Sequence, residues 1–198
     1  DISKNDRLNM RMHVDHYFDQ IGLRLNGDVS FSQNKTQYPP NGLYTIWTHV
    51  ARLNSLARCF NSAGHPTGGQ ENPYVEIDPT AGYRKNDTRY TNMNLSMQWD
   101  VPKVTGLSFG ALVNYNLYDS FNKDWRANEA GVGPVWEWND EPTNLGKARL
   151  DEDMYRSNEV TFEARADYNR TFKEAHTIGA TAVFNSWKYN YNELGALR

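Results

Sequence analysis

The chain has 198 residues, of which 38% are hydrophobic and 23% charged, and its mean hydropathy is -0.80. The 21 Lys and Arg against 24 Asp and Glu give a formal charge of -3, so no basic surplus exists to gather nucleic acid, and no nucleic-acid partner is expected. No stretch approaches the ~20 consecutive apolar residues of a membrane-spanning helix.

The first predicted element is a β-hairpin at about residues 7–32. Apolar residues occupy every second position from Leu8 to Phe18, broken only by His16, and the same alternation returns from Ile21 to Phe31. A period of two places successive side chains on opposite faces of a strand. Asp19 and Gln20 are predicted to form the connecting turn.

A long connection follows at about residues 33–89, and it carries a helical pattern. Apolar residues recur at three- and four-residue spacing after Pro39 and Pro40, and the residues are Leu43, Ile46, Trp47, Val50, Leu53, Ala57 and Phe60. Asn61 and Gly64 mark the expected stop. The pattern predicts one amphipathic helix, which either packs on the base of its own loop or meets a partner protein.

Two further hairpins are predicted at about residues 90–121 and 158–187. Their alternating stretches are joined by short turns at 102–105 and 173–175, and a second long connection lies at about 119–157. Short turns and long connections therefore alternate. Water-soluble sandwiches usually have strands of ~5 to 6 residues and loops below ~15 residues, whereas these strands are longer.

The pattern indicates an all-β fold, specifically a segment of an antiparallel transmembrane β-barrel with two long extracellular loops. Tilted strands of ~9 to 11 residues with short turns at one end, an apolar outer face and a polar inner face are typical of bacterial outer-membrane barrels. Aromatic residues gather at both ends of the strands, as the two membrane interfaces require. The expected girdles are Phe18, Trp99, Phe109 and Phe172 near the short turns, and Phe31, Tyr115, Phe121 and Phe184 towards the loops.

Six strands in an open sheet would leave two unpaired edges facing lipid, where each unsatisfied backbone group costs several kcal/mol. The sequence is therefore expected to be an internal segment of a larger barrel.

Three stretches of the chain resemble barrel segments of SusC/RagA-type TonB-dependent transporters of Bacteroidetes. The first is NMRMHVDHYFDQIGLRLNGDVSFSQN (9–34), and the second is NPYVEIDPTAGYRKNDTRYTNMNLSMQWDVPKVTGLSFGALVNYNLYDSFNKDW (72–125). The third is EVTFEARADYNRTFKEAHTIGATAVF (159–184), with a Tyr-Asn pair, a Phe before the turn and a His after it. The order of these motifs along the chain carries the resemblance.

The resemblance implies a plugged barrel of about 22 strands that imports oligosaccharides or peptides. A SusD/RagB-like surface lipoprotein would cover the outer opening, and the TonB complex would act through a plug and TonB box that this sequence does not contain. No enzymatic activity, cofactor or metal is implied. A passive porin and a soluble secreted β-sandwich that binds glycans remain the alternatives.

Charged residues on the inward row are the first candidates for substrate contact. They are Arg11, Arg24, Asp28, Glu163, Arg165 and Asp167. In one interpretation they pair across neighbouring strands or touch the plug, and in the other they line the substrate path. Glu163 and Asp167 lie among arginines on one strand face, which does not favour acid–base catalysis.

Tryptophans of the long connections are the second set of candidates. Trp47 lies on the predicted helix, and Trp125, Trp136 and Trp138 are assigned to the second loop, where they either contact a ligand or lid protein or anchor the loop internally. His49 and His65 are expected to be solvated loop residues. Neither they nor the Asp151–Asp153 cluster has the spacing of metal ligands.

Overall fold

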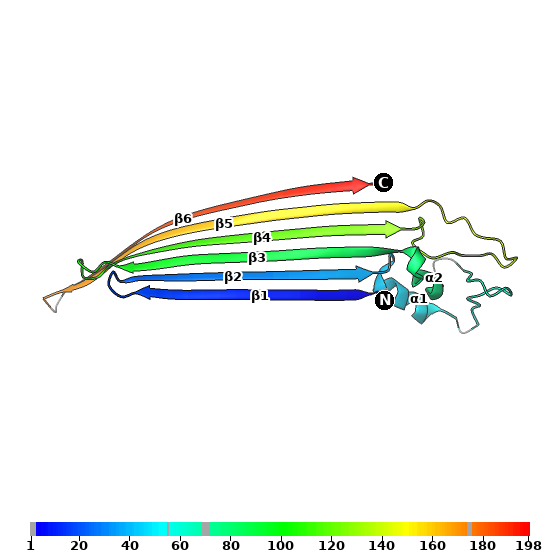
Figure 1. The fold of residues 1–198 in the computed structure, drawn as a ribbon, viewed down its shortest axis with the longest axis horizontal. Coiled ribbons are helices and arrows are strands. Elements are labelled where there is room, and N and C mark those ends of the chain that lie inside the picture. The colour runs from blue at the N-terminus through cyan, green and yellow to red at the C-terminus, as the bar shows by residue number, and fades with distance from the viewer. Residues whose placement is uncertain (1–2, 55, 69–71, 174–175) are drawn as a thin grey trace.

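Antiparallel β-strands make up most of the computed structural model, which describes residues 3–54, 56–68, 72–173 and 176–198. Within these ranges six strands form one sheet in the order of the sequence (Figure 1). They are β1 (Lys4–Phe18), β2 (Leu23–Tyr38), β3 (Gly82–Asp100), β4 (Leu107–Arg126), β5 (Arg149–Phe172) and β6 (His176–Leu197). The three hairpins expected from the alternation lie within the pairs β1–β2, β3–β4 and β5–β6.

Two glycines hold consecutive hairpins side by side at the short-turn end. The carbonyl of Gly22 accepts the backbone N–H of Asp100 at 2.9 Å, and the carbonyl of Gly106 accepts that of Asn169 at 2.8 Å. Both glycines have positive φ, at 66° and 87°. A Cβ at Gly106 would approach the Asn169 carbonyl oxygen to 2.0 Å, so only glycine permits this contact.

The strands extend further towards the loops than the sequence alternation indicates. Residues 33–38 belong to β2 and 82–89 to β3, so the first connection shortens to 39–81, and the second shortens from 119–157 to 127–148. β6 likewise continues past 187 to Leu197. These extensions are polar or mixed on both faces, and hydrophobic alternation cannot reveal a strand that has no apolar face.

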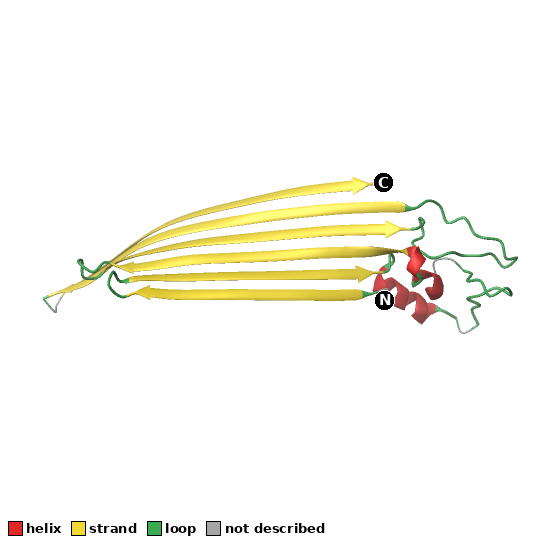
Figure 2. Cartoon of the chain, in the orientation of Figure 1, coloured by secondary structure: helices red, strands yellow, loops and turns green. Residues whose placement is uncertain are grey.

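The helices lie in the first connection, at the end of the sheet opposite the short turns (Figure 2). They are α1 (Gly42–Arg52), α2 (Pro73–Glu76) and a 3₁₀ turn (Pro79–Ala81). The helix expected to reach Phe60 ends at Arg52, and the side chain of Asn54 accepts the backbone N–H of Leu56, a local bond that competes with helix. In the described residues no helix is long and apolar enough to cross a membrane.

The sheet is a single curved layer (Figures 1 and 2). The buried apolar side chains lie outside it. Ile46, Val75, Ala81, Val132 and Val135 are buried, and all belong to the two connections. On the sheet, large apolar side chains are exposed, for example Met12 at 62% and Leu95 at 58%. Within the described ranges no second sheet packs on this one.

Strand register places most of the exposed apolar side chains of the sheet on one face, and this set is here called the apolar band. One row across the sheet runs from Met12 through Val29, Met93 and Tyr115 to Val160. The other members are Leu8, Met10, Val14, Phe18, Leu23, Leu25, Phe31, Leu95, Met97, Trp99, Leu107, Phe109, Ala111, Val113, Leu117, Phe162, Ala164, Ala166, Tyr168, Phe172, Ile178, Ala180, Ala182 and Phe184.

Both borders of the apolar band are slanted relative to the rows of paired residues. The row that contains Phe18 on β1 reaches β5 at Ala166, whereas the aromatic residue at the turn end of β5 is Phe172, six residues further on. At the loop end, the row of Phe31 on β2 reaches β6 at Asn190, and Phe184 lies six residues closer to the turn. Between these end strands each border shifts by six residues over four strand-to-strand steps, while at the turn end Trp99 on β3 and Phe109 on β4 still lie in the row of Phe18.

Candidate functional site on the polar face of the sheet

The face opposite the apolar band carries a closed ring of four asparagine side chains. Asn92 donates to Asn116, Asn116 to Asn114 at 2.9 Å, Asn114 to Asn94, and Asn94 back to Asn92 at 2.9 Å. The residues come from β3 and β4, where Asn92 faces Asn116 and Asn94 faces Asn114. The hydroxyl of Tyr90 also donates to Asn116, at 3.0 Å.

The amide ring uses only part of the hydrogen-bonding capacity of its side chains. Each asparagine amide has two N–H donors and a carbonyl oxygen with two lone pairs. The ring occupies one donor and one lone pair of each, and all four side chains are half-buried. The remaining groups form an uncharged polar surface that can hydrogen-bond to hydroxyl or amide groups.

The inward charges of β1 and β2 are largely engaged with neighbours. Arg11 binds the carboxylate of Asp28 at 2.9 Å, and Nδ1 of His13 lies 3.5 Å from the same carboxylate. The guanidinium of Arg24 lies 5.5 Å from the centre of the Tyr17 ring, within cation–π range. Pairing across neighbouring strands thus accounts for Arg11 and Asp28.

The inward charges of β5 border a hollow of about 210 Å³ on the polar face. Glu163 and Arg165 line it, and Gly110 opposite Arg165 contributes no side chain, which leaves the space open. Arg165 binds Asp167 at 2.6 Å, and Thr181 donates to Asp167 at 2.8 Å. Strands β3 and β4 separate these β5 residues from the other predicted site residues, Arg11, Arg24 and Asp28, on β1 and β2. The two sets of candidate residues therefore share the polar face without contacting each other.

Sequence reasoning missed an aromatic strip on this same face. Trp187, Tyr189 and Tyr191 follow one another along β6 at ring separations of 6.2 and 6.5 Å. Tyr155 on β5 continues the strip, with its hydroxyl 2.8 Å from that of Tyr189, and Tyr118 on β4 lies 5.9 Å from Tyr155. Alternating Trp, Tyr and Tyr could have revealed this strip, but the sixth strand was expected to end near 187.

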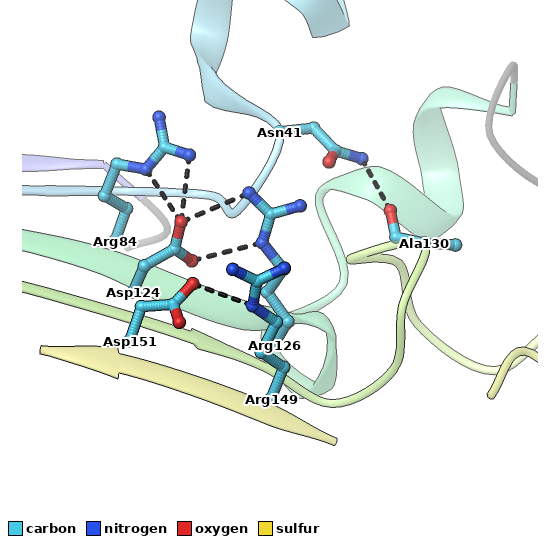
Figure 3. Close-up of polar contacts among 7 residues, drawn as sticks. All are labelled: Asn41, Arg84, Asp124, Arg126, Ala130, Arg149 and Asp151. Carbon is cyan, nitrogen blue, oxygen red and sulfur yellow. Dashed lines mark hydrogen bonds and ion pairs between the residues drawn. The ribbon is translucent and has the colours of Figure 1, made fainter. Parts of the chain in front are cut away.

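A charged cluster lies on the polar face where the strands meet the loops (Figure 3). Asp124 binds both Arg84 at 2.9 Å and Arg126 at 3.2 Å, and Arg149 binds Asp151 at 2.8 Å. A hollow of about 360 Å³ lies beside this cluster. Positive and negative side chains alternate in this cluster, so each one is held by an oppositely charged neighbour. The electrostatic potential at the loop end of the polar face is therefore not dominated by one sign of charge.

The four tryptophans assigned to the connections occupy different environments. Trp125 lies on β4 rather than in the second loop, on the same face as the apolar band, with its ring 5.7 Å from that of Tyr83. Trp136 stacks on His65 at 4.6 Å and so anchors its loop. Trp47 on α1 is 69% exposed and Trp138 is 57% exposed, which leaves these two available for a ligand or partner.

The connections contain two histidine–carboxylate pairs, and the one at His49 corrects the expectation that this residue is solvated, whereas the side chain of His65 is 45% exposed. His49 is largely buried and lies 2.8 Å from the fully buried Glu76. His65 lies 2.6 Å from Asp140, which also accepts from Asn61 at 2.8 Å. The hydrogen bonds from His65 and Asn61 lower the pKa of Asp140 below its ordinary value.

The described residues contain no group of three or more His, Cys, Asp or Glu side chains that could hold a metal ion. Comparison with models of known protein families and with curated proteins gives no match.

Proposed function

We propose that this sheet is part of the wall of an outer-membrane β-barrel, with the apolar band facing lipid and the polar face lining the lumen. The slanted borders of the band carry this proposal. Six residues span about 20 Å along a strand, and four strand-to-strand steps span about 19 Å, so borders level with a membrane require strands tilted by about 45°. Transmembrane barrel strands are tilted by about 35–45°.

The height of the apolar band also fits a membrane. On β4 the band runs from Leu107 to Leu117, which is about 33 Å along the strand and about 23 Å in height at this tilt. The lipid-facing band of outer-membrane barrels is about 25 Å tall.

The uncovered apolar face disfavours the alternative of a soluble sandwich. A sandwich covers its apolar face with a second sheet about 10 Å away, and soluble monomers rarely expose apolar patches above a few hundred Å². Here members of the band are exposed on β1, β3, β4, β5 and β6 and half-buried on β2. Lipid would cover this face, and further strands would pair with the edges of β1 and β6 to close the barrel.

The barrel is proposed to belong to a TonB-dependent transporter of the SusC/RagA type that imports oligosaccharides or peptides. The ordered motifs of residues 9–34, 72–125 and 159–184 support this class. The amide ring and aromatic strip support a role in solute passage, because amides hydrogen-bond to hydroxyl and peptide groups and aromatic faces stack on apolar ligand surfaces. A SusD/RagB-like lipoprotein would cover the opening, and the protein would perform no covalent chemistry.

The proposal is tested on the full-length protein in the cells that produce it. We expect recovery in the outer-membrane fraction, purification only in detergent, and a lipoprotein partner that mass spectrometry detects in the purified complex. Uptake of its substrate should stop when TonB is deleted. Uptake that continues without TonB would indicate a passive porin, and recovery as a detergent-independent soluble protein would refute the barrel.

A further inference from the structure

A cluster of four lysines lies on the lipid-facing side of the sheet, between the apolar band and the loops. Lys4, Lys35, Lys85 and Lys123 come from four consecutive strands and line a hollow of about 360 Å³, together with Phe121. Register places all of them on the face of the apolar band.

Lys35 stands opposite Asp6 and Asp87 in the register, whereas the pairing of β3 with β4 brings two like charges together. Lys85 and Lys123 are directly opposed on β3 and β4, where like charges destabilise a sheet. Their side chains diverge: Lys85 extends over the ring of Tyr83 at 4.2 Å, and Lys123 binds Glu152 at 2.6 Å.

Three carboxylates near the hollow are each bound by one cation, and two of these cations, Lys4 and Lys123, belong to the cluster itself. Asp6 is bound by Lys4 at 3.1 Å, Asp87 by Arg89 at 2.8 Å, and Glu152 by Lys123 at 2.6 Å. Across the described ranges, Lys35 and Lys85 make no ion pair within 4.0 Å. These two ammonium groups are therefore the ones available to an external anion.

The height of the cluster identifies what kind of anion would reach it. Lys35 lies four residues past Phe31, or about 9 Å above the band at a tilt of about 45°, and Lys85 lies eight residues past Met93, or about 19 Å above it. The polar layer of an ordinary phospholipid leaflet is only about 5–7 Å thick. Lys35 can reach down to that layer, whereas Lys85 requires a headgroup that rises well above it.

We propose that the lysine cluster binds the phosphate groups of a large-headgroup anionic glycolipid in the outer leaflet. This inference rests on the proposed membrane location. The bound phosphates would offset the repulsion between Lys85 and Lys123, and Phe121 would contact the apolar parts of the headgroup. The glycolipid would thereby fix the loop end of the wall at a defined height in the leaflet.

The test uses the full-length protein purified in detergent and native mass spectrometry of its lipid adducts. The probes are lipopolysaccharide with a phosphorylated inner core, the same lipid after removal of its phosphates, phosphatidylglycerol, and inorganic phosphate. The double variant Lys35→Gln/Lys85→Gln should bind the phosphorylated glycolipid about 30-fold more weakly, because each lysine contributes about a factor of five near an anionic surface. Lys35→Arg/Lys85→Arg should retain binding.

The matched control is Lys103→Gln/Lys173→Gln, which removes the same charge at the short-turn end and should leave binding unchanged. Equal binding of the phosphorylated and dephosphorylated glycolipid would overturn the proposal. Equally strong binding of inorganic phosphate or phosphatidylglycerol would overturn the glycolipid assignment. If the unmodified protein and every variant were absent from the outer membrane, the barrel proposal itself would be refuted. This outcome distinguishes a failure of the barrel proposal from a failure of the glycolipid proposal.

Discussion

The carbonyl of Gly106 and the backbone N–H of Asn169 form a 2.8 Å hydrogen bond that joins the turn of the second hairpin to the first strand of the third. The turn between β3 and β4 is thereby held against β5. The bond depends on glycine, because φ at Gly106 is 87° and no Cβ fits beside the Asn169 carbonyl.

Gly106→Ala should therefore destabilise the protein by at least about 2 kcal/mol, since a left-handed conformation costs an L-residue about 1–2 kcal/mol before any clash. Urea unfolding of the full-length protein, followed by tryptophan fluorescence, measures the loss. Gly179→Ala is the control, because nothing lies within 4 Å of a Cβ at that position. An equal effect at both positions would contradict the packing argument.

Leu95 and Ser96 are adjacent residues of β3 whose side chains lie on opposite faces, and they test which face meets lipid. Leu95→Lys should destabilise the folded protein in bilayers by about 2–4 kcal/mol, the cost of a lysine on the lipid face near the midplane. Ser96→Lys should cost far less, because its side chain would enter the polar lumen. Unfolding titrations in lipid vesicles compare the two variants, and equal costs would argue against a lipid-facing band.

The asparagine ring should show coupling between strands. Asn94→Ala and Asn114→Ala should each cost about 0.5–1.5 kcal/mol, the usual net contribution of a hydrogen bond. The double variant should cost less than the sum, because either change opens the same ring. Strict additivity in a double-mutant cycle of unfolding free energies would show that the ring is not a unit. The control is the same double-mutant cycle for Asn158→Ala and Asn190→Ala, which form a single amide–amide hydrogen bond on the opposite face and, within the described ranges, belong to no ring.

Trp187 should contribute to substrate passage. Trp187→Ala is expected to weaken substrate binding about 2- to 10-fold, since stacking on one aromatic ring contributes about 0.5–1.5 kcal/mol. The measurement is the concentration dependence of uptake, normalised to folded protein in the outer membrane. Phe184→Ala removes an aromatic ring from the lipid-facing side and should leave the affinity unchanged. Unaltered affinity in Trp187→Ala would remove the strip from the substrate path.

Acid should loosen the link between the two connections at Asp140. Because hydrogen bonds from His65 and Asn61 lower its pKa below 3.8, the carboxylate stabilises the folded link above its unfolded pKa, and this stabilisation is lost as pH falls through the lower folded value. The protection of residues 127–148 against hydrogen exchange, taken relative to the intrinsic exchange rate at each pH, should therefore fall in this acidic range. Asp140→Asn should abolish that acid response, and an unchanged response would assign it to another group.

Alternation in the sequence predicts the hairpins and the faces of the sheet because burial or lipid contact imposes a period of two on apolar residues. Alternation cannot reveal a strand whose two faces are both polar. It therefore places the polar ends of β2 and β3 in loops. Trp125 was misplaced for the same reason. The asparagine ring depends on the register within the β3–β4 hairpin, which pairs Asn92 with Asn116 and Asn94 with Asn114, and the pattern of a single strand carries no information about register. The pairing of His49 with Glu76 likewise arises only from tertiary contact.

The slant of the apolar band also determines how much of a barrel rim these strands occupy. A strand tilted by about 45° takes up about 7 Å of circumference, so the six strands here would span about 40 Å. A closed ring of 22 such strands would have a circumference of about 150 Å and a mean diameter near 47 Å. An opening of that width would admit most soluble nutrients, so selectivity in the proposed transporter would depend on whatever fills the ring, and the asparagine ring and aromatic strip would add only weak, uncharged contacts.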